Sequence, residues 1–378
     1  MYEIIDKYID KLIKGSTPEM PLWNIEAIRQ GKKPAWNYID GCFMTSILEL
    51  YKHTKKAEYL DFVVKYVDAF VSEDGSILGY DPQKCSTDDI CESRILFDLY
   101  DITKNEKYKK AIDLTYSQIK IQPRTFEGNF WHKKIYPNQV WLDGLFMAQV
   151  FYMRYETILN GCMNYSDIRK QFENVRKNMF DEKKHLYYHG YDASRQMFWA
   201  DKKTGLSKNF WLRSIGWFVV ALADILGYMN EAIYEDYDFY KRLLKETIDG
   251  LLEYQDKESH MFYQVVDKQN KEGNYLETSG SAMISYAILK AVRLNALPDR
   301  YQQIGLDIFN GICNKYVTEK DGDLNVGGIC LVAGLGPEKN LRRDGSYEYY
   351  ISEPVVENDA KGIGPLILAY SEVKKIID

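Results

Sequence analysis

An aspartate that follows a tryptophan and opens an apolar segment is the strongest candidate for chemistry in this sequence. Asp143 lies in the run Trp141-Leu142-Asp143-Gly144, and the loop before it carries Lys133. A carboxylate in such a place can act as a general acid and a general base. Aspartate is also a favoured N-cap of helices, so a purely structural role stays open at the level of the residue alone. The repeat in which Asp143 stands, described below, favours the catalytic interpretation.

A second pair of carboxylates, Asp88 and Asp89, opens another apolar segment. One of the two is expected to cap a helix, and the other to face a pocket and accept hydrogen bonds from sugar hydroxyls. Two carboxylates at one site also suit a conventional glycosidase, whose acid and base flank the scissile bond. The sequence gives no distance between Asp88 and Asp143, so both interpretations remain.

Aromatic and basic residues gather in a third region. His189 lies in a tyrosine-rich loop, where it is either a hydrogen-bonded loop residue or a catalytic one. Arg213 follows soon after, between Trp211 and Trp217. A guanidinium is the favoured fork for a carboxylate, and an indole is a good platform for a sugar ring. An arginine that only satisfies loop carbonyls is the alternative. Further cations that could face the same pocket, or simply be solvated, are Lys133, Arg342, Arg343 and Lys361.

No spacing in the sequence is typical of a metal or nucleotide site. The six cysteines form no C-x-x-C pair, and they are expected to be reduced thiols. The run Gly362-Ile363-Gly364-Pro365 lacks the preceding strand and the third glycine of a dinucleotide fingerprint. We therefore expect neither a metal nor a cofactor.

Two kinds of helix alternate along the chain and must position these residues. Helices with one apolar stripe are predicted to begin near residues 2, 57, 106, 166, 237 and 299. Segments that are apolar nearly all round open at 39–41, 87–89, 141–144, 211–214, 277–280 and 358–362. Six outer and six inner helices use up the whole chain, which predicts an all-α (α/α)6 barrel with one domain over residues 1–378.

The loops that precede the inner helices are the long ones, for example 127–139 and 186–209. Such loops on one rim of a rigid scaffold commonly hold binding residues. Short strands are predicted within 186–189 and 262–266. The N-termini of all six inner helices should meet at this rim, where their dipoles favour an anionic ligand.

Composition narrows the class of partner. The 378 residues carry a formal net charge of −6, and no run of Lys and Arg offers a surface for nucleic acid or an anionic membrane. The first sixteen residues predict an amphipathic helix rather than a signal peptide, and no apolar run is long enough to span a membrane. We expect a cytoplasmic protein. The 31 tyrosines suit a carbohydrate ligand as well as an aromatic core.

Five sequence blocks, in order, resemble one enzyme family. They are residues 128–133, 139–147, 210–217, 275–281 and 349–352. The chain resembles the unsaturated rhamnogalacturonyl hydrolases of glycoside hydrolase family 105, and more distantly the unsaturated glucuronyl hydrolases of family 88. The resemblance implies a small oligosaccharide substrate, left by a polysaccharide lyase, with a C4=C5 unsaturated uronic acid at its non-reducing end.

The resemblance also implies roles for individual residues. Asp143 would protonate C4 and take a proton from the water that adds at C5. Asp88 matches a second aspartate that holds sugar hydroxyls. The matching pocket and cleft positions are His189, Arg213 and Trp217, with Tyr38, Lys133, Trp141 and Trp211 around them. Two departures, Lys361 in place of a histidine and Ile39-Asp40 in place of a His-Gln pair, leave the aglycone open.

Other functions stay open at this level. An unsaturated glucuronyl hydrolase would use the same residues on other lyase products. Sugar epimerases share the barrel, but their chemistry is expected to use a pair of basic histidines. His189 has no obvious histidine partner in the sequence. A conventional inverting glycosidase would need Asp88 and Asp143 roughly 6.5–9.5 Å apart. A non-catalytic scaffold would fill the space enclosed by the inner helices at this rim with apolar side chains.

Overall fold

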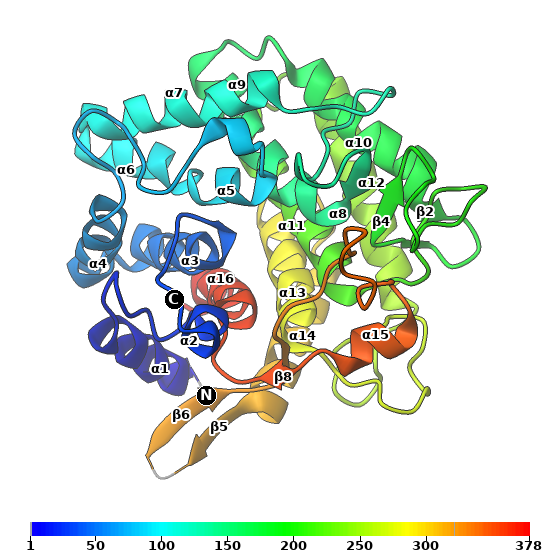
Figure 1. The fold of residues 1–378 in the computed structure, drawn as a ribbon. Coiled ribbons are helices and arrows are strands. Elements are labelled where there is room, and N and C mark those ends of the chain that lie inside the picture. The colour runs from blue at the N-terminus through cyan, green and yellow to red at the C-terminus, as the bar shows by residue number, and fades with distance from the viewer. Residues whose placement is uncertain (1, 321) are drawn as a thin grey trace.

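The computed structural model describes residues 2–320 and 322–378, and they form two concentric rings of helices (Figure 1). The outer helices are α1 (Tyr2–Gly15), α4 (Ala57–Asp68), α7 (Glu106–Ile121), α10 (Tyr165–Met179), α12 (Tyr234–Leu252) and α14 (Arg300–Tyr316). Four inner helices are continuous or nearly so: α3 (Tyr38–Thr54), α11 (Leu212–Tyr228), α13 (Thr278–Arg293) and α16 (Ala360–Ile377). The all-α (α/α)6 barrel expected from the sequence is confirmed, with each outer helix beginning within three residues of its predicted start.

Two inner helices are broken, which the apolar pattern did not predict. The second consists of α5 (Thr87–Glu92) and α6 (Ile95–Thr103). The third begins as a short α8 (Leu142–Gly144), passes through a π-helical turn at Leu145–Gln149, and continues as α9 (Val150–Leu159). Single π-turns inside helices occur often at functional sites. Here the turn follows Asp143 directly.

The inner ring closes on itself. In sequence order, α3 contacts α5, α5 contacts the π-turn, the π-turn contacts α11, and α11, α13, α16 and α3 follow in contact. Burial explains the two layers: every residue of α11 from Leu212 to Leu226 is buried, whereas α4 buries only one face, with Tyr59, Val63, Tyr66 and Val67. The hydroxyl of Tyr370 donates to the carbonyl of Tyr2, which fastens the last helix to the first.

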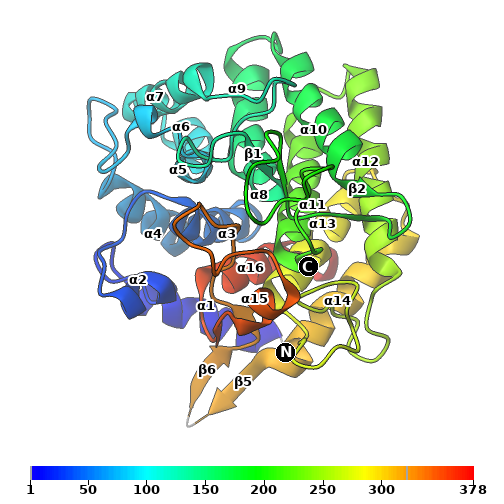
Figure 2. The ribbon, with the colours of Figure 1, turned by 45° about the vertical axis from the view of Figure 1, so that its right-hand side comes forward.

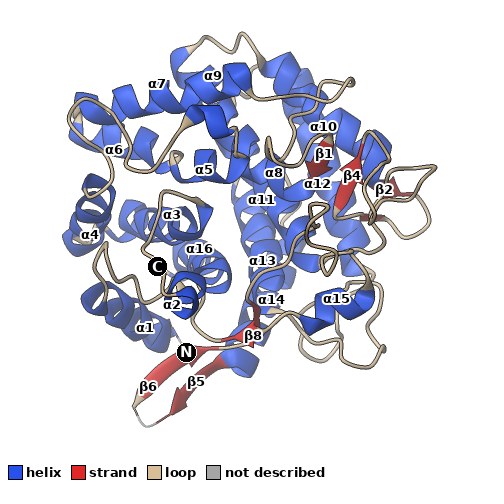
Figure 3. Cartoon of the chain, in the orientation of Figure 1, coloured by secondary structure: helices blue, strands red, loops and turns tan. Residues whose placement is uncertain are grey.

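The strands are short and lie in the connections (Figure 3). Four antiparallel pairs join β1 (Gln139–Trp141) to β4 (Gly190–Asp192), β2 (Phe180–Asp181) to β3 (Leu186–Tyr187), β5 (Val317–Lys320) to β6 (Asp323–Val326), and β7 (Ile329–Cys330) to β8 (Val355–Val356). The predicted strand at 186–189 is confirmed in part by β3. Residues 262–266 form only isolated bridges, Tyr263 with Leu276 and Val265 with Trp211.

Several elements were not predicted, among them the short helices α2 (Ile25–Gln30) and α15 (Tyr347–Ser352), the β1–β4 and β7–β8 pairs and the β5–β6 hairpin. Figure 2 shows that hairpin extending from the ring beside α14. No helix among the described residues has the length and apolar character needed to cross a membrane.

Candidate active site

A cavity of about 310 Å³ opens at the end of the barrel where the inner helices begin. Of the nine residues to which the resemblance assigns a place in the site, five line it, namely Tyr38, Asp88, Lys133, Trp141 and Asp143. They come from the starts of α3, α5 and α8 and from the loop before β1, so the rim predicted from the long loops is where the cavity lies. Its other lining residues include Glu26, Asp89, His132, Tyr136 and Arg343.

Asp143 sits in the first turn of α8 but does not cap it. The N-cap position belongs to Trp141, which makes no side-chain capping bond. The carboxylate is therefore free of the structural role that the sequence left open. It is buried, with 7% of the residue exposed, and it faces the cavity.

The β1–β4 pair brings His189 to Asp143. Its register sets Trp141 opposite Gly190, and the backbone N–H of Leu142 donates to the carbonyl of His189. A Cβ atom at position 190 would lie 2.4 Å from Leu335 and 3.2 Å from Trp141, so this close approach requires glycine. The Nε2 atom of His189 lies 3.3 Å from Oδ2 of Asp143.

The other ring nitrogen of His189 defines its tautomer. Nδ1 lies 2.6 Å from the hydroxyl of Tyr350 in α15, and burial raises the pKa of that phenol well above its ordinary value. A phenol that keeps its proton donates a hydrogen bond to Nδ1, and a ring that accepts at Nδ1 carries its N–H proton on Nε2, facing Asp143. The 3.3 Å contact is not aligned as a hydrogen bond, and neither Asp143 Oδ2 nor His189 Nε2 has another partner among the described residues. Both atoms are thus buried without a hydrogen-bond partner.

Asp88 is held differently. Its Oδ2 lies 2.5 Å from Nζ of Lys133, and its Oδ1 lies 3.4 Å from Nε2 of His132. Burial alone would raise the pKa of Asp88, but the adjacent Lys133 and His132 outweigh it and hold the pKa below its usual range. Burial and the charge of Asp88 raise the pKa of the neighbouring Asp89 to about 6. Asp88 therefore stays ionised beside a carboxyl group that retains a proton more readily.

One wall of the cavity consists of stacked rings. The imidazole of His132 stacks on the indole of Trp141 with centroids 4.3 Å apart, and Tyr136 stacks on the same indole at 5.1 Å. Burial lowers the pKa of His132 to about 4, so this ring is neutral at pH 7. No histidine partner for His189 was evident from the sequence, yet His132 and His189 both contact Trp141. The absence of a second histidine near His189 therefore does not exclude an epimerase.

His189, Trp211, Arg213 and Trp217, all predicted as site residues, lie behind the cavity and not in its lining. The guanidinium of Arg213 bonds Oγ of Ser279 at 2.7 Å, lies 3.5 Å from Glu277 and donates to the carbonyl of Cys330. The Arg213 guanidinium, which was expected to bind a substrate carboxylate, is thus already bonded to groups of the protein itself. Trp211 packs parallel to Tyr350, and Trp217 stacks on Phe146.

Two charged lining residues carried little or no signal in the sequence. Glu26 reaches the cavity from α2, and its Oε2 lies 3.0 Å from Nζ of the fully buried Lys361. Arg343, which the sequence offered only as one of several cations, lines the cavity and has no carboxylate within ion-pair distance in the part of the chain that the structure describes. Within residues 2–320 and 322–378, no three His, Cys, Asp or Glu residues are grouped so that they could hold a metal ion.

Comparison with known proteins identifies the family. The family described as Glycosyl Hydrolase Family 88 matches residues 8–377. The chain belongs to this family of glycoside hydrolases. A solved family 105 glycoside hydrolase from C. acetobutylicum ATCC 824 is 41% identical, with a TM-score of 0.88 over 94% of this chain and 98% of that one. The resemblance drawn from the five sequence blocks is confirmed, and the family supports the expected hydrolase over the alternative of an epimerase.

Two further relatives are more distant. The unsaturated rhamnogalacturonyl hydrolase YesR of Bacillus subtilis (strain 168) is 25% identical over 266 residues, which cover 69% of this chain and 72% of the relative. The solved unsaturated glucuronyl hydrolase from Bacillus sp. GL1 is 14% identical and has a TM-score of 0.63 over 90% of this chain and 86% of that one, which shows a shared fold.

Proposed function

We propose that this glycoside hydrolase acts by hydrating the C4=C5 double bond of an unsaturated uronic acid at the non-reducing end of a short oligosaccharide. The observation that carries the proposal is the contrast between the two buried carboxylates. Asp88 is ion-paired with Lys133, whereas Oδ2 of Asp143 has no hydrogen-bond partner among the described residues. A carboxyl group that must gain and lose a proton in each cycle needs such freedom.

In this proposal Asp143 begins the cycle protonated and gives its proton to C4. The cation that forms at C5, stabilised by the ring oxygen, is attacked by water, and the ionised Asp143 takes a proton from that water. The resulting hemiketal opens by cleavage of the C5–O5 bond to give a ketone at C5. The hemiacetal left at C1 then releases the aglycone, so that one water molecule is consumed overall.

The neighbours of Asp143 have supporting roles in this scheme. The Nε2–H of His189, fixed by Tyr350, faces the carboxylate and stabilises its ionised form between the two proton transfers. The stacked wall around Trp141 offers a flat face to the sugar ring. Asp88, kept ionised by Lys133, accepts hydrogen bonds from sugar hydroxyls.

The substrate carboxylate needs a cation or several donors. Because Arg213 is tied to Glu277 and Ser279, we assign this role to Arg343, supported by Lys133. Arginine matches a carboxylate with two parallel N–H donors.

We favour unsaturated galacturonic acid from rhamnogalacturonan over the unsaturated glucuronyl products of other lyases, since YesR is named for the first activity. The test follows the near-ultraviolet absorbance of the conjugated uronate during incubation with lyase-digested rhamnogalacturonan and, in parallel, lyase-digested glycosaminoglycan. A faster loss on the first digest is expected. A faster loss on the second would move the assignment to the glucuronyl branch, and no loss on either with folded protein would contradict the proposed function.

A further inference from the structure

Two carboxyl groups in the cavity lining, Glu26 and Asp89, have no role in the hydration scheme, and Glu26 is the one that a buried cation holds. It is the contribution of α2 to the cavity lining, next to Asn37, Tyr38 and Ile39 at the start of α3. The backbone N–H of Ala360 donates to the carbonyl of Trp23, so the segment before α2 is fixed to the start of α16 (Figures 1 and 2). This hydrogen bond helps to fix the position of α2, and with it Glu26, at the cavity.

A buried lysine holds the carboxylate of Glu26. The side chain of Lys361 has no solvent exposure, and its Nζ atom lies 3.0 Å from Oε2 of Glu26 and 3.1 Å from Oδ1 of Asp359. A fully buried ammonium requires such partners, because an unpaired charge in the interior is strongly unfavourable. Since Asp359 is itself buried and ion-paired to the same lysine, the three residues together carry one net negative charge. That charge is presented to the cavity by Glu26, whose side chain is 22% exposed.

Three carboxylates in the cavity lining differ in exposure. The side chain of Asp143 is 11% exposed and that of Asp88 is 13% exposed, compared with 22% for Glu26. The unsaturated ring is the terminal sugar and must reach Asp143, so the aglycone extends toward the more exposed part of the cavity. Glu26 therefore lies on the aglycone side.

We infer that Glu26, oriented by Lys361, selects a neutral aglycone and rejects an acidic one. This inference rests on the proposed function and names the substrate class of the same site. An ionised carboxylate accepts hydrogen bonds from the hydroxyls of a neutral sugar, and it repels a second carboxylate or a sulfate at that position. The carboxylate of the unsaturated ring itself is assigned to Arg343 and Lys133.

The test compares two disaccharides that share the unsaturated galacturonyl ring, one with rhamnose and one with galacturonate as the aglycone. Glu26→Gln keeps the size of the side chain and an oxygen that can accept from Lys361, but it removes the charge. We expect kcat/KM on the galacturonate-linked substrate to rise about 10-fold and that on the rhamnose-linked substrate to fall about 3-fold, as one charge at this range in a partly solvated cavity warrants. Both changes should be in KM, since Glu26 does not touch the reacting atoms.

The control is Glu19→Gln, which removes a solvent-exposed carboxylate from the same N-terminal segment and should leave both substrates unchanged. An unchanged ratio of the two substrates in Glu26→Gln overturns the inference. So does an equal loss on both accompanied by a lowered Tm, because that result marks a merely structural residue.

A binding measurement separates this inference from the proposed function. Calorimetric Kd values for the same two disaccharides are taken on Asp143→Asn, with and without Glu26→Gln. If the wild type turns over neither substrate, the proposed function fails, while a shift of the Kd ratio in the expected direction still supports the role of Glu26. An unshifted ratio, or binding of neither disaccharide, overturns it.

Discussion

At the scale of the residue, the two aspartates of the cavity differ in what surrounds them. Lys133 lies 2.5 Å from Asp88, whereas Asp143 lies 3.3 Å from Nε2 of His189, off the hydrogen-bond direction, and has no ion pair with a lysine or arginine among the described residues. The first arrangement fixes a permanent negative charge. The second permits protonation and deprotonation in turn, which assigns the proton transfers to Asp143 and the binding of hydroxyls to Asp88.

Replacing Asp143 by Asn should abolish turnover and preserve the fold. The amide fills the same space but cannot relay protons, so we expect kcat to fall at least about 10³-fold, within the usual range for the loss of a general acid and base. Because Asp143 makes no capping bond, Tm should change little. Activity near that of the wild type, measured on a defined unsaturated disaccharide, would remove Asp143 from the mechanism.

His132 should make the stability of the protein depend on pH. Burial lowers its pKa in the folded state to about 4, compared with about 6.5 in an unfolded chain. Between those values the unfolded chain binds a proton that the folded protein does not, so stability falls as the pH is lowered. The contribution is about 3 kcal/mol from pH 7 to pH 4, as an order of magnitude.

Burial of Asp40 and Asp89 raises the pKa of each to about 6, which favours the folded state at low pH and opposes this trend. The comparison must therefore be made against His132→Gln, which retains both aspartates. Denaturant unfolding of the two proteins should show the stability advantage of the wild type shrinking by about 3 kcal/mol as the pH falls from 7 to 4. A constant difference would mean that His132 titrates normally.

At the scale of the element, the spacing of apolar residues predicted where the outer helices begin. The outer helices α4 and α7 begin at the predicted residues because one face of each is apolar. The break between α5 and α6 and the π-turn after Asp143 were not predicted, because a buried helix has the same apolar pattern whether it is continuous or broken. Both depend on packing against neighbouring helices.

Site residues were predictable where sequence neighbours share an element. Asp143 and Trp141 stand at one helix start, and they line the cavity together. Glu26 was missed because a glutamate on a short polar helix resembles any solvated residue, and its partner Lys361 is 335 positions away. Arg213 was identified, but only the tertiary contacts reveal that Glu277 and Ser279 already engage it.

Arg213 should therefore be measured first for stability. It joins the starts of α11 and α13 through Glu277, and neither side chain is more than 2% exposed. Arg213→Ala leaves a buried carboxylate unpaired, so the free energy of unfolding should fall by about 3–5 kcal/mol. The control Arg242→Ala removes an exposed arginine paired with Asp238 and should change stability by less than about 1 kcal/mol. Full stability of Arg213→Ala with a raised KM would instead support direct contact with substrate.

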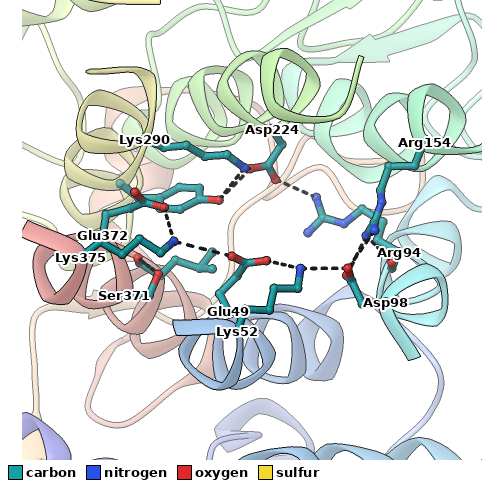
Figure 4. A network of polar contacts seen from close by, with 12 residues as sticks. Glu49, Lys52, Arg94, Asp98, Arg154, Asp224, Lys290, Ser371, Glu372 and Lys375 are labelled. Carbon is teal, nitrogen blue, oxygen red and sulfur yellow. Dashed lines mark hydrogen bonds and ion pairs between the residues drawn. The ribbon is translucent and has the colours of Figure 1, made fainter. Parts of the chain in front are cut away.

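At the scale of the whole molecule, a belt of charged contacts links the inner helices near their C-terminal ends, away from the cavity, and Figure 4 shows much of this network. The six contacts that join neighbouring inner helices are Lys52–Asp98, Asp98–Arg154, Arg154 over the ring of Tyr228, Asp224–Lys290, Arg293–Glu372 and Lys375–Glu49. On α3 the belt begins at Glu49, eleven residues after Tyr38, or roughly 16 Å along the helix axis. The barrel thus separates a stabilising end from a catalytic end.

Asp98→Asn tests that separation. Asp98 accepts two hydrogen bonds from Arg154 and pairs with Lys52, and these cations outweigh burial and hold its pKa far below the usual range. Its removal should lower the free energy of unfolding by about 3 kcal/mol, because the buried Arg154 loses its carboxylate partner and Lys52 keeps only Glu49. The exposed Asp101→Asn on the same helix is the control. At 25 °C kcat/KM should be unchanged, and a selective loss of activity with normal stability would refute the separation.

The central claim, hydration of the double bond by Asp143, is tested most directly by following two signals in one reaction. The near-ultraviolet absorbance reports the C4=C5 bond, and a reducing-sugar assay reports the released aglycone. The claim predicts that the absorbance falls no later than the aglycone appears, and that neither signal changes with Asp143→Asn. Release of the aglycone while the absorbance persists would contradict it, because that order belongs to a conventional glycosidase that cleaves the C1–O bond directly.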